Sequence, residues 1–336
     1  MKSQNILLVG IFTLLLLAGL FALLQVSAAP AVANADLVVD TLADEFNSDG
    51  DCSLREAISA ANDNNEIDVC GSGDVFTDTI TFSVSGTITL GEQLSVMAGG
   101  PLVIAGGGVI TVSGNHSVRV FEVNSGGELS LNSLSVIQGD ASDGGGIWNH
   151  GKLTIDNSVF GSNSADFEGG GILNYGALTI KSSIFDGNSA TWGGGILNSG
   201  SLTLTTGTLS GNNAIERGGG IYNPGGELIV GNSTFDGNSS NEGAGIYTDT
   251  SGKTIIVEST FDGNSAYDGG CILNHGTLEI TNSTLSANSS EEYGGGVANS
   301  GTLTLTNSTL SGNSSSAEGG GIYSSHGTIT LINSTL

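Results

Sequence analysis

A glycine triplet recurs at an almost constant interval from the middle of the chain onward. The triplet or a close variant begins at Gly144, Gly169, Gly193, Gly218, Gly243, Gly269, Gly294 and Gly319, so successive starts are 24 to 26 residues apart. A fixed period of this length indicates structural units that stack on one another and cannot fold alone. Residues 144–336 are therefore predicted to form a solenoid of regular repeats.

Short runs within each repeat alternate apolar and polar residues, for example Leu153 and Ile155 in one repeat and Leu303 and Leu305 in another. Alternation with period two is typical of strands with one buried face, and the spacing typical of helices is absent from the repeats. Turn residues separate the runs, which predicts about three short strands and three corners per repeat. Three strands per turn, stacked in parallel every ~4.8 Å, form a parallel β-helix.

Asparagine also recurs at equivalent positions of successive repeats. Stacked at a corner, such amides can hydrogen-bond to one another as in cross-β ladders. Asparagine and glycine both tolerate the left-handed backbone that corners require. The predicted structural ladder is Asn163, Asn188, Asn212, Asn238, Asn264, Asn288 and Asn313, and a second column is Asn149, Asn174, Asn198, Asn223, Asn274 and Asn299.

Charge and the amino terminus restrict where the protein works. Seven Lys and Arg against 33 Asp and Glu give a net charge of −26, which excludes a nucleic-acid partner because phosphate binding needs clustered basic residues. Residues 1–35 combine Lys2, a long apolar run and small residues, as in a secretory signal peptide, although an uncleaved anchor is an alternative. We expect no further transmembrane span, and a secreted or cell-surface protein of unknown oligomeric state.

Residues 36–75 differ from the repeats and are expected to form an N-terminal cap made of a strand, an acidic loop and a helix. Ser53 and Glu56 form a capping box at the start of this helix, which is expected over residues 54–62. Export favours a disulfide between Cys52 and Cys70, with two buried thiols as the alternative. Residues 76–143 are expected to form irregular opening rungs.

The acidic loop also suggests a calcium site. Glu45, Asn47, Asp49, Gly50 and Glu56 fall at positions 1, 3, 5, 6 and 12 of an EF-hand-like loop. Position 1 of an EF-hand loop is normally Asp, and the side chain of Glu45 is longer than that of Asp. The candidate calcium ligands are therefore Asn47, Asp49 and Glu56, with a solvated turn as the alternative, and we expect no other cofactor.

The segment "CSLREAISAAN", Cys52 to Asn62, followed by "ITF" and "GTITL", resembles the CSLREA-type N-terminal region of exported bacterial proteins. The "GGGI…N.G.LTI.NS.F.GN.A" rungs are similar to the β-helix repeats of those proteins and of chlamydial polymorphic outer-membrane proteins. The resemblance implies an all-β, right-handed, pectin-lyase-like parallel β-helix of roughly ten rungs with a short helical cap, exposed at a bacterial surface or outer membrane. The chain ends at "LINSTL" in mid-rung, so we expect a column without a C-terminal cap.

Some β-helices are polysaccharide lyases or hydrolases, which need clustered carboxylates and, for a lyase, a basic residue. Asp186, Asp236 and Asp262 fall at equivalent positions of their repeats, but no Arg or Lys shares their "FDGN" stretch. We therefore predict no enzyme and no catalytic residue, with a lyase or hydrolase as the less favoured alternative.

The residue after "GGGI" is predicted to point outward, since its neighbours Ile and Asn point inward. An exposed apolar stripe often marks a partner surface, so we expect an adhesin-like module for glycans or a cell-surface protein; the alternatives are stiffening by stacked side chains and a structural stalk or coat without a ligand. The predicted binding stripe, which includes four aromatic residues just before the glycines, is Trp148, Leu173, Leu197, Tyr222, Tyr247, Leu273, Ala298, Tyr323, Phe167, Trp192, Tyr267 and Tyr293.

Overall fold

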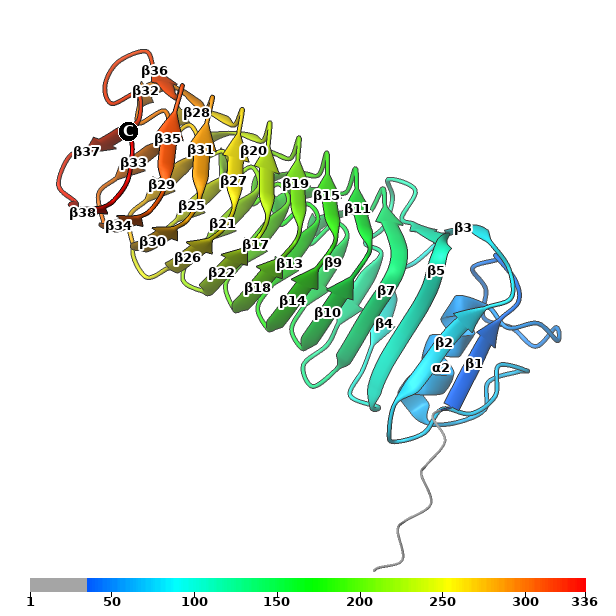
Figure 1. Cartoon of the computed structure of the whole chain (residues 1–336). Helices are drawn as coiled ribbons and strands as arrows, with labels where there is room; N and C mark the ends of the chain where they lie inside the picture. Colours follow the sequence, from blue (N-terminus) through cyan, green and yellow to red (C-terminus); the bar gives the residue numbers. More distant parts are fainter. Residues whose placement is uncertain (1–34) are drawn as a thin grey trace, which may run out of the picture. The chain divides into compact units, whose positions relative to one another are not determined.

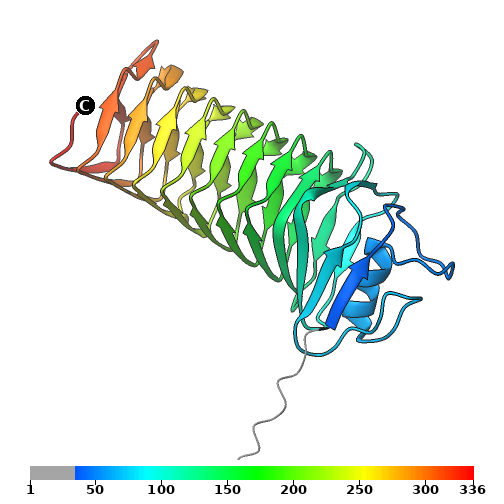
Figure 2. The ribbon, with the colours of Figure 1, turned by 45° about the vertical axis from the view of Figure 1, so that its right-hand side comes forward.

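The computed structural model describes residues 35–336 (Figure 1). The predicted signal segment lies outside these residues except for Ala35. In the described part the chain winds into a right-handed, all-β parallel solenoid of about 10 turns, with one short helix near its start (Figures 1 and 2). The predicted fold class is thus confirmed.

Three parallel sheets run along the column. The ten-stranded sheet contains β4 (Leu94–Val96), β6 (Phe121–Val123), β9 (Ile147–Asn149), β13 (Ile172–Asn174), β17 (Ile196–Asn198), β21 (Ile221–Asn223), β25 (Ile246–Thr248), β29 (Ile272–Asn274), β33 (Val297–Asn299) and β37 (Ile322–Ser324). The eight-stranded sheet contains β8 (Asp140–Asp143), β12 (Ser164–Glu168), β16 (Ser189–Trp192), β20 (Asn213–Arg217), β24 (Ser239–Glu242), β28 (Ser265–Asp268), β32 (Ser289–Tyr293) and β36 (Ser314–Ser315).

The twenty-stranded sheet holds the remaining strands in two parallel columns, which the long strands β5 and β7 join. Its strands are β1 (Ala35–Val39), β2 (Asp78–Phe82), β3 (Gly86–Thr89), β5 (Pro101–Ser113), β7 (Glu128–Ile137), β10 (Lys152–Asp156), β11 (Val159–Gly161), β14 (Ala177–Lys181), β15 (Ile184–Asp186), β18 (Ser201–Thr205), β19 (Thr208–Ser210), β22 (Glu227–Gly231), β23 (Thr234–Asp236), β26 (Lys253–Val257), β27 (Thr260–Asp262), β30 (Thr277–Thr281), β31 (Thr284–Ser286), β34 (Thr302–Thr306), β35 (Thr309–Ser311) and β38 (Thr328–Ile332).

Each regular turn has three faces but four strands, because the face in the twenty-stranded sheet is split. In one turn the order is β13, β14, β15 and β16. Between β14 and β15 lies Ser182 with a φ of 47°, and the equivalent Asn232 and Asn307 each have a φ of 49°. A residue in the left-handed region breaks the strand. The prediction of three strands per repeat is therefore wrong, whereas three faces per turn are correct.

The core is a column of apolar side chains that repeat at the same place in each turn. Phe160 stacks on Phe185 with ring centroids 4.7 Å apart, and Phe235 stacks on Phe261 at 4.5 Å. Ile side chains of the ten-stranded sheet, such as Ile172, and Leu and Ile side chains of the other strand of the split face, such as Leu178 and Ile180, complete it and are buried. The eight-stranded sheet contributes small side chains such as Ala190. Because each layer covers the next, the core is continuous along the column.

The asparagine ladder is present and buried. The Nδ2 atom of Asn188 donates to Oδ1 of Asn212 at 2.9 Å and to the carbonyl of Phe160 at 3.0 Å. The same Oδ1 also accepts the backbone N–H of Asn188 at 3.1 Å. Each amide thus satisfies buried groups of the turns on both sides. In the second column amide also bonds to amide, for example Nδ2 of Asn149 to Oδ1 of Asn174 at 2.7 Å. This column is interrupted at Thr248, whose hydroxyl bonds to that of Thr254.

The glycine triplet is required where adjacent turns meet most closely. Gly169 has a φ of +64°, and a Cβ atom there would lie 2.4 Å from the carbonyl oxygen of Ile172. A Cβ on Gly170 would lie 2.3 Å from the carbonyl oxygen of Ser189 in the next turn. Cys271 replaces the third glycine of one triplet and is a buried free thiol.

The N-terminal cap closes the first turn (Figure 2). β1 pairs in parallel with β2, so the cap contributes a strand to the column itself. The helix α2 (Leu54–Asp63) begins at the Ser53 and Glu56 capping box and buries its apolar side against β1, β2 and β4. Arg55 pairs with Asp44 at 2.8 Å and donates to the carbonyl of Glu92 at 2.6 Å, which fixes the helix to the opening turns.

A disulfide joins Cys52, just before α2, to Cys70, 18 residues later. It closes the loop that contains the whole helix. The predicted pairing is therefore present, and both sulfur atoms are buried.

We expect Asn212→Ala to lower the free energy of unfolding by about 3 kcal/mol, because it leaves buried donors and acceptors of two neighbouring turns unpaired. Asn241→Ala, at an exposed position of β24, is the matched control and is expected to change stability little. Denaturant unfolding followed by circular dichroism measures both. Equal effects of the two variants would contradict a stabilising ladder.

Cys52→Ser/Cys70→Ser is expected to lower the unfolding free energy by about 3 kcal/mol, as chain-entropy arguments give for a loop of this size. Urea titration of the purified protein measures this, with the buried free thiol left intact in both samples. A double variant as stable as the parent protein would show that the bridge does not hold the cap.

Candidate functional site

The predicted binding stripe is a true column, but most of it is covered. Leu173, Leu197, Tyr222, Tyr247 and Leu273 occupy one register position of successive strands in the ten-stranded sheet. They point away from the main core and form a second hydrophobic cluster, in which Leu173 is only 1% exposed and Tyr222, the most exposed of these five, 9%. The prediction that this central column is exposed is therefore wrong.

Side chains at the corner before the glycine triplets cover part of the column. Trp192 and Tyr293 at this corner are half-buried and pack against the cluster, as does Trp148, which occupies the column position next to Leu173. The guanidinium of Arg217 lies 5.0 Å from the ring centroid of Tyr247 and pairs with Glu242 at 2.9 Å. Large side chains beside the column thus bury the outer face of the ten-stranded sheet, which forms a second hydrophobic core.

The tyrosines of this region are held in their neutral form. Tyr175 donates a hydrogen bond of 2.9 Å to Glu168, and burial followed by this carboxylate raises the pKa of Tyr175 to about 12. Burial also raises the pKa of Tyr247. With these raised pKa values both phenols stay protonated near neutral pH, and the Tyr175 hydroxyl serves as a hydrogen-bond donor.

Two residues of the predicted stripe are exposed, and they lie on another surface. Phe167 on β12 is 54% exposed and Tyr267 on β28 is 45% exposed. Ile215, on β20 between them, is 66% exposed. We call these three residues the apolar row. Sequence reasoning missed Ile215, because it lies three residues before its glycine triplet, whereas Phe167 and Tyr267 lie two residues before theirs.

A hollow of about 410 Å³ lies between two members of the apolar row. Ile215 and Tyr267 line it together with the polar side chains of Asn213, Ser239 and Asn241. The surface thus combines apolar side chains with hydroxyl and amide groups on a stiff sheet.

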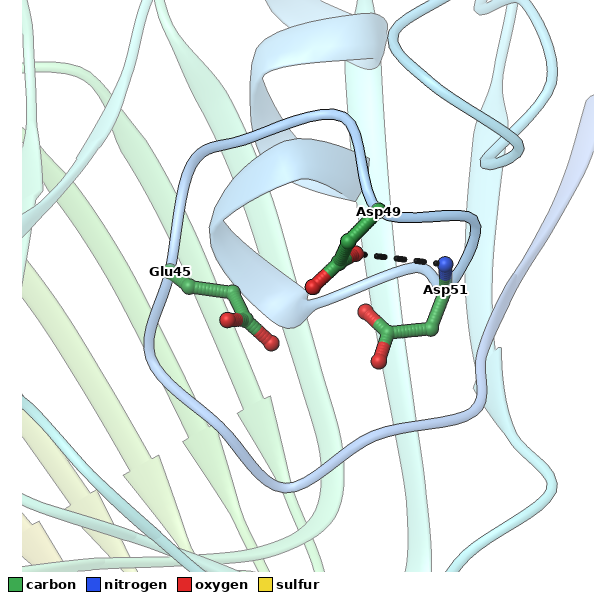
Figure 3. A group of neighbouring side chains, drawn as sticks. All are labelled: Glu45, Asp49 and Asp51. Carbon is green, nitrogen blue, oxygen red and sulfur yellow. Dashed lines mark hydrogen bonds between the residues drawn. The ribbon is translucent and has the colours of Figure 1, made fainter.

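The acidic loop of the cap has a carboxylate group different from the predicted one. Oxygen atoms of Glu45, Asp49 and Asp51 lie within 4.8 Å of one another (Figure 3). The Glu56 carboxylate is not among them, because it accepts the backbone N–H groups of Asn47 at 2.8 Å and Ser53 at 2.9 Å. Asn47 donates its side-chain amide to Glu45 at 3.0 Å. Of the predicted calcium ligands, only Asp49 belongs to the group.

Asp51 is the least satisfied member of this group. Its Oδ1 atom is buried without a hydrogen-bond partner, whereas its backbone N–H donates to Asp49 at 3.4 Å (Figure 3). Loss of solvation, then the charges of Asp49 and Glu45, raise the pKa of Asp51. Calcium binding by the cap stays a prediction. The set Glu45, Asp49 and Asp51 was not predicted from the sequence, and its carboxylate oxygens are suitable ligands for that ion.

The aspartates considered for hydrolysis do lie in one column, and all are exposed. Asp236 pairs with Asp262 in register, and Ser210 separates Asp186 from Asp236. Ser210 donates to Asp186 at 2.7 Å and Ser286 donates to Asp262 at 2.6 Å. These carboxylates form hydrogen bonds along the outer surface of the sheet.

Comparison with known proteins gives one family match. Residues 182–199, 232–249 and 307–325 match the Chlamydia polymorphic membrane protein repeat. The chain is a β-helix repeat protein whose turns resemble this repeat. No curated protein and no solved structure matches the chain.

The matched repeat suggests a surface or outer-membrane location. Each matched segment covers the corner and the glycine triplet, so the match reflects the solenoid geometry described above. The CSLREA-type resemblance of the cap rests on the sequence alone. Among the described residues no helix is long and apolar enough to cross a membrane.

We expect Asp51→Asn to raise the unfolding midpoint at pH 7 in the presence of a chelator. The raised pKa of Asp51 means that folding penalises its charged form. This loss of stability is complete at pH values above the pKa of Asp51 in the folded protein. It disappears as the pH falls below the pKa of an ordinary carboxyl group. The advantage of the variant is therefore expected to shrink towards pH 4, as thermal unfolding at several pH values measures.

Calcium is expected to stabilise the parent protein and to stabilise Asp51→Asn less, because the cation offsets the repulsion between the three carboxylates. Asp166→Asn, an exposed change on β12, is the control for a general charge effect. A chelator-treated parent protein whose unfolding midpoint does not respond to calcium would show that the group binds no such ion.

Proposed function

We propose that the protein is a secreted or cell-surface adhesin-like module, and that the outer surface of its eight-stranded sheet binds glycans. The observation that carries the proposal is the apolar row, Phe167, Ile215 and Tyr267. These side chains project from alternate strands, β12, β20 and β28, among residues that are mostly Ser, Asn and Glu.

The spacing of the apolar row suits an extended chain of sugars. Strands of a sheet lie ~4.8 Å apart, so alternate strands are about 10 Å apart, which is about the length of two linked sugar units. Phe167 and Tyr267 offer ring faces that can pack on the apolar side of a sugar. Asn213, Ser239 and Asn241 offer groups that hydrogen-bond to its hydroxyls.

Charge narrows the class of glycan. A net charge of −26 disfavours polyanionic partners through long-range repulsion. Neutral glycans are therefore favoured over sulfated or uronic-acid chains. A stiff column that repeats one surface also suits weak contacts made several times, since linked weak contacts give a strong overall interaction.

A structural stalk or coat without a ligand is the second candidate. The buried aromatic column favours it, because stacked side chains between turns stiffen the solenoid whether or not anything binds. The two candidates make different demands on the apolar row: a stalk needs no exposed aromatic rings there, whereas a glycan-binding surface does.

We expect Phe167→Ser/Ile215→Ser/Tyr267→Ser to reduce binding at least tenfold on a glycan array and in a cell-adhesion assay. Val159→Ser/Ile184→Ser is the matched control, since Val159 is 36% and Ile184 42% exposed on the twenty-stranded sheet. Unchanged binding by the triple variant would remove the apolar row from the function. No binding by the parent protein would favour the stalk, and release of unsaturated sugars would indicate a lyase.

A further inference from the structure

The covered column of the ten-stranded sheet has one position with a small side chain. β29 places Leu273 there and β37 places Tyr323, but β33 between them carries Ala298. A methyl group cannot fill the space of a leucine or a tyrosine. A hollow of about 210 Å³ lies at this position.

Aromatic rings form one side of this hollow. Tyr293, at the corner before the glycine triplet, stacks on Tyr323 with ring centroids 4.4 Å apart and planes 20° from parallel. Both rings are half-buried, and Leu273 and Ala298 also line the hollow. In neighbouring turns the same space holds larger side chains, for example Tyr222 and Tyr247, whose rings lie 5.2 Å apart.

Polar groups also line the hollow, and Asp268 lies next to Tyr293 in the adjacent strand. Asp268 lines the hollow and accepts the backbone N–H of Tyr293 through Oδ1 at 3.2 Å. His275 bonds to the Ser300 hydroxyl through Nδ1, which leaves Nε2 for another partner. Burial first, then the nearby charge of Glu292, raises the pKa of Asp268. The hollow therefore offers a carboxylate, an imidazole and a hydroxyl close to two aromatic rings.

We propose that the hollow at Ala298 is a binding subsite for a single neutral pyranose unit. Its volume of about 210 Å³ accommodates one six-membered sugar ring, and a further linked unit would lie outside it. The apolar side of the sugar packs on the tyrosine rings, and its hydroxyls donate to Asp268 and bond to His275 and Ser300. This inference rests on the proposed function, and Tyr267 of the apolar row directly precedes Asp268 in the chain.

The same groups select against an acidic sugar. A uronic acid would bring a second carboxylate next to Asp268, which already lies near Glu292. Like charges at short distance in a partly desolvated site repel strongly. The subsite is therefore expected to accept glucose-type, galactose-type or N-acetylglucosamine-type rings and to reject glucuronic acid.

The test uses the whole protein and methyl glycosides of glucose, galactose, N-acetylglucosamine and glucuronic acid at millimolar concentrations. Saturation-transfer NMR and calorimetry are expected to detect saturable binding of at least one neutral glycoside and none of the glucuronide. Ala298→Leu fills the hollow with a side chain that the column already carries at Leu173, Leu197 and Leu273, so it is compatible with the fold. It is expected to weaken binding at least tenfold.

Ala177→Leu, which adds the same side chain at an exposed position of β14, is the matched control and is expected to bind as the parent protein does. Asp268→Asn is expected to reduce the discrimination against the glucuronide. Unchanged neutral-sugar binding in Ala298→Leu, or no saturable binding of any neutral glycoside, would overturn the subsite. Glycan-array binding that depends on the apolar row alone would overturn the subsite and leave the proposed function standing.

Discussion

Every part of this structure depends on parallel hydrogen bonding between one turn and the next. Each strand pairs in register with the equivalent strands of the adjacent turns, for example Leu153 with Leu178 and Leu178 with Leu202. The pairing fixes the distance between turns at the spacing of strands in a sheet. Any side chain at a given position must therefore tolerate the side chain one turn away. Asparagine and phenylalanine do so by amide bonding and ring stacking, and glycine does so where the backbones of adjacent turns meet.

The same constraint explains why the repeat carries so little obvious chemistry. A buried position that must be compatible with its own copies in adjacent turns is restricted to side chains that stack. Carboxylates of the repeats lie on the outer surface, where even Asp236 and Asp262 are neighbours in register. Exposed carboxylates such as Asp186 and Asp262 are accordingly bonded to serine hydroxyls of the adjacent turn. Distinct chemistry can arise only where a turn departs from the pattern, as Ala298 does in the covered column.

The sequence was sufficient to predict the solenoid, the asparagine ladder and the helical cap, because all three depend on local patterns that repeat or are self-contained. Glu56 shows that two predictions from local sequence patterns can conflict at one residue. Glu56 fitted both a helix cap and a calcium loop. In the structure one carboxylate oxygen accepts the N–H of Ser53 in the capping box, and the other accepts the N–H of Asn47 in the acidic loop. Backbone N–H groups left unpaired at a buried helix start are costly, so the cap prevails.

Exposure of the aromatic column could not be predicted in the same way, since it depends on what the corners beside it carry. Alternation correctly indicates that Leu197 and Tyr247 point away from the main core, but not that Arg217, Trp192 and Tyr293 reach over them. Those residues follow no strict repeat and differ from turn to turn. Coverage is therefore decided turn by turn, and so is accessibility. On a repetitive column the informative positions are the irregular ones: an isoleucine on a polar surface, or an alanine where the adjacent turns place leucine and tyrosine.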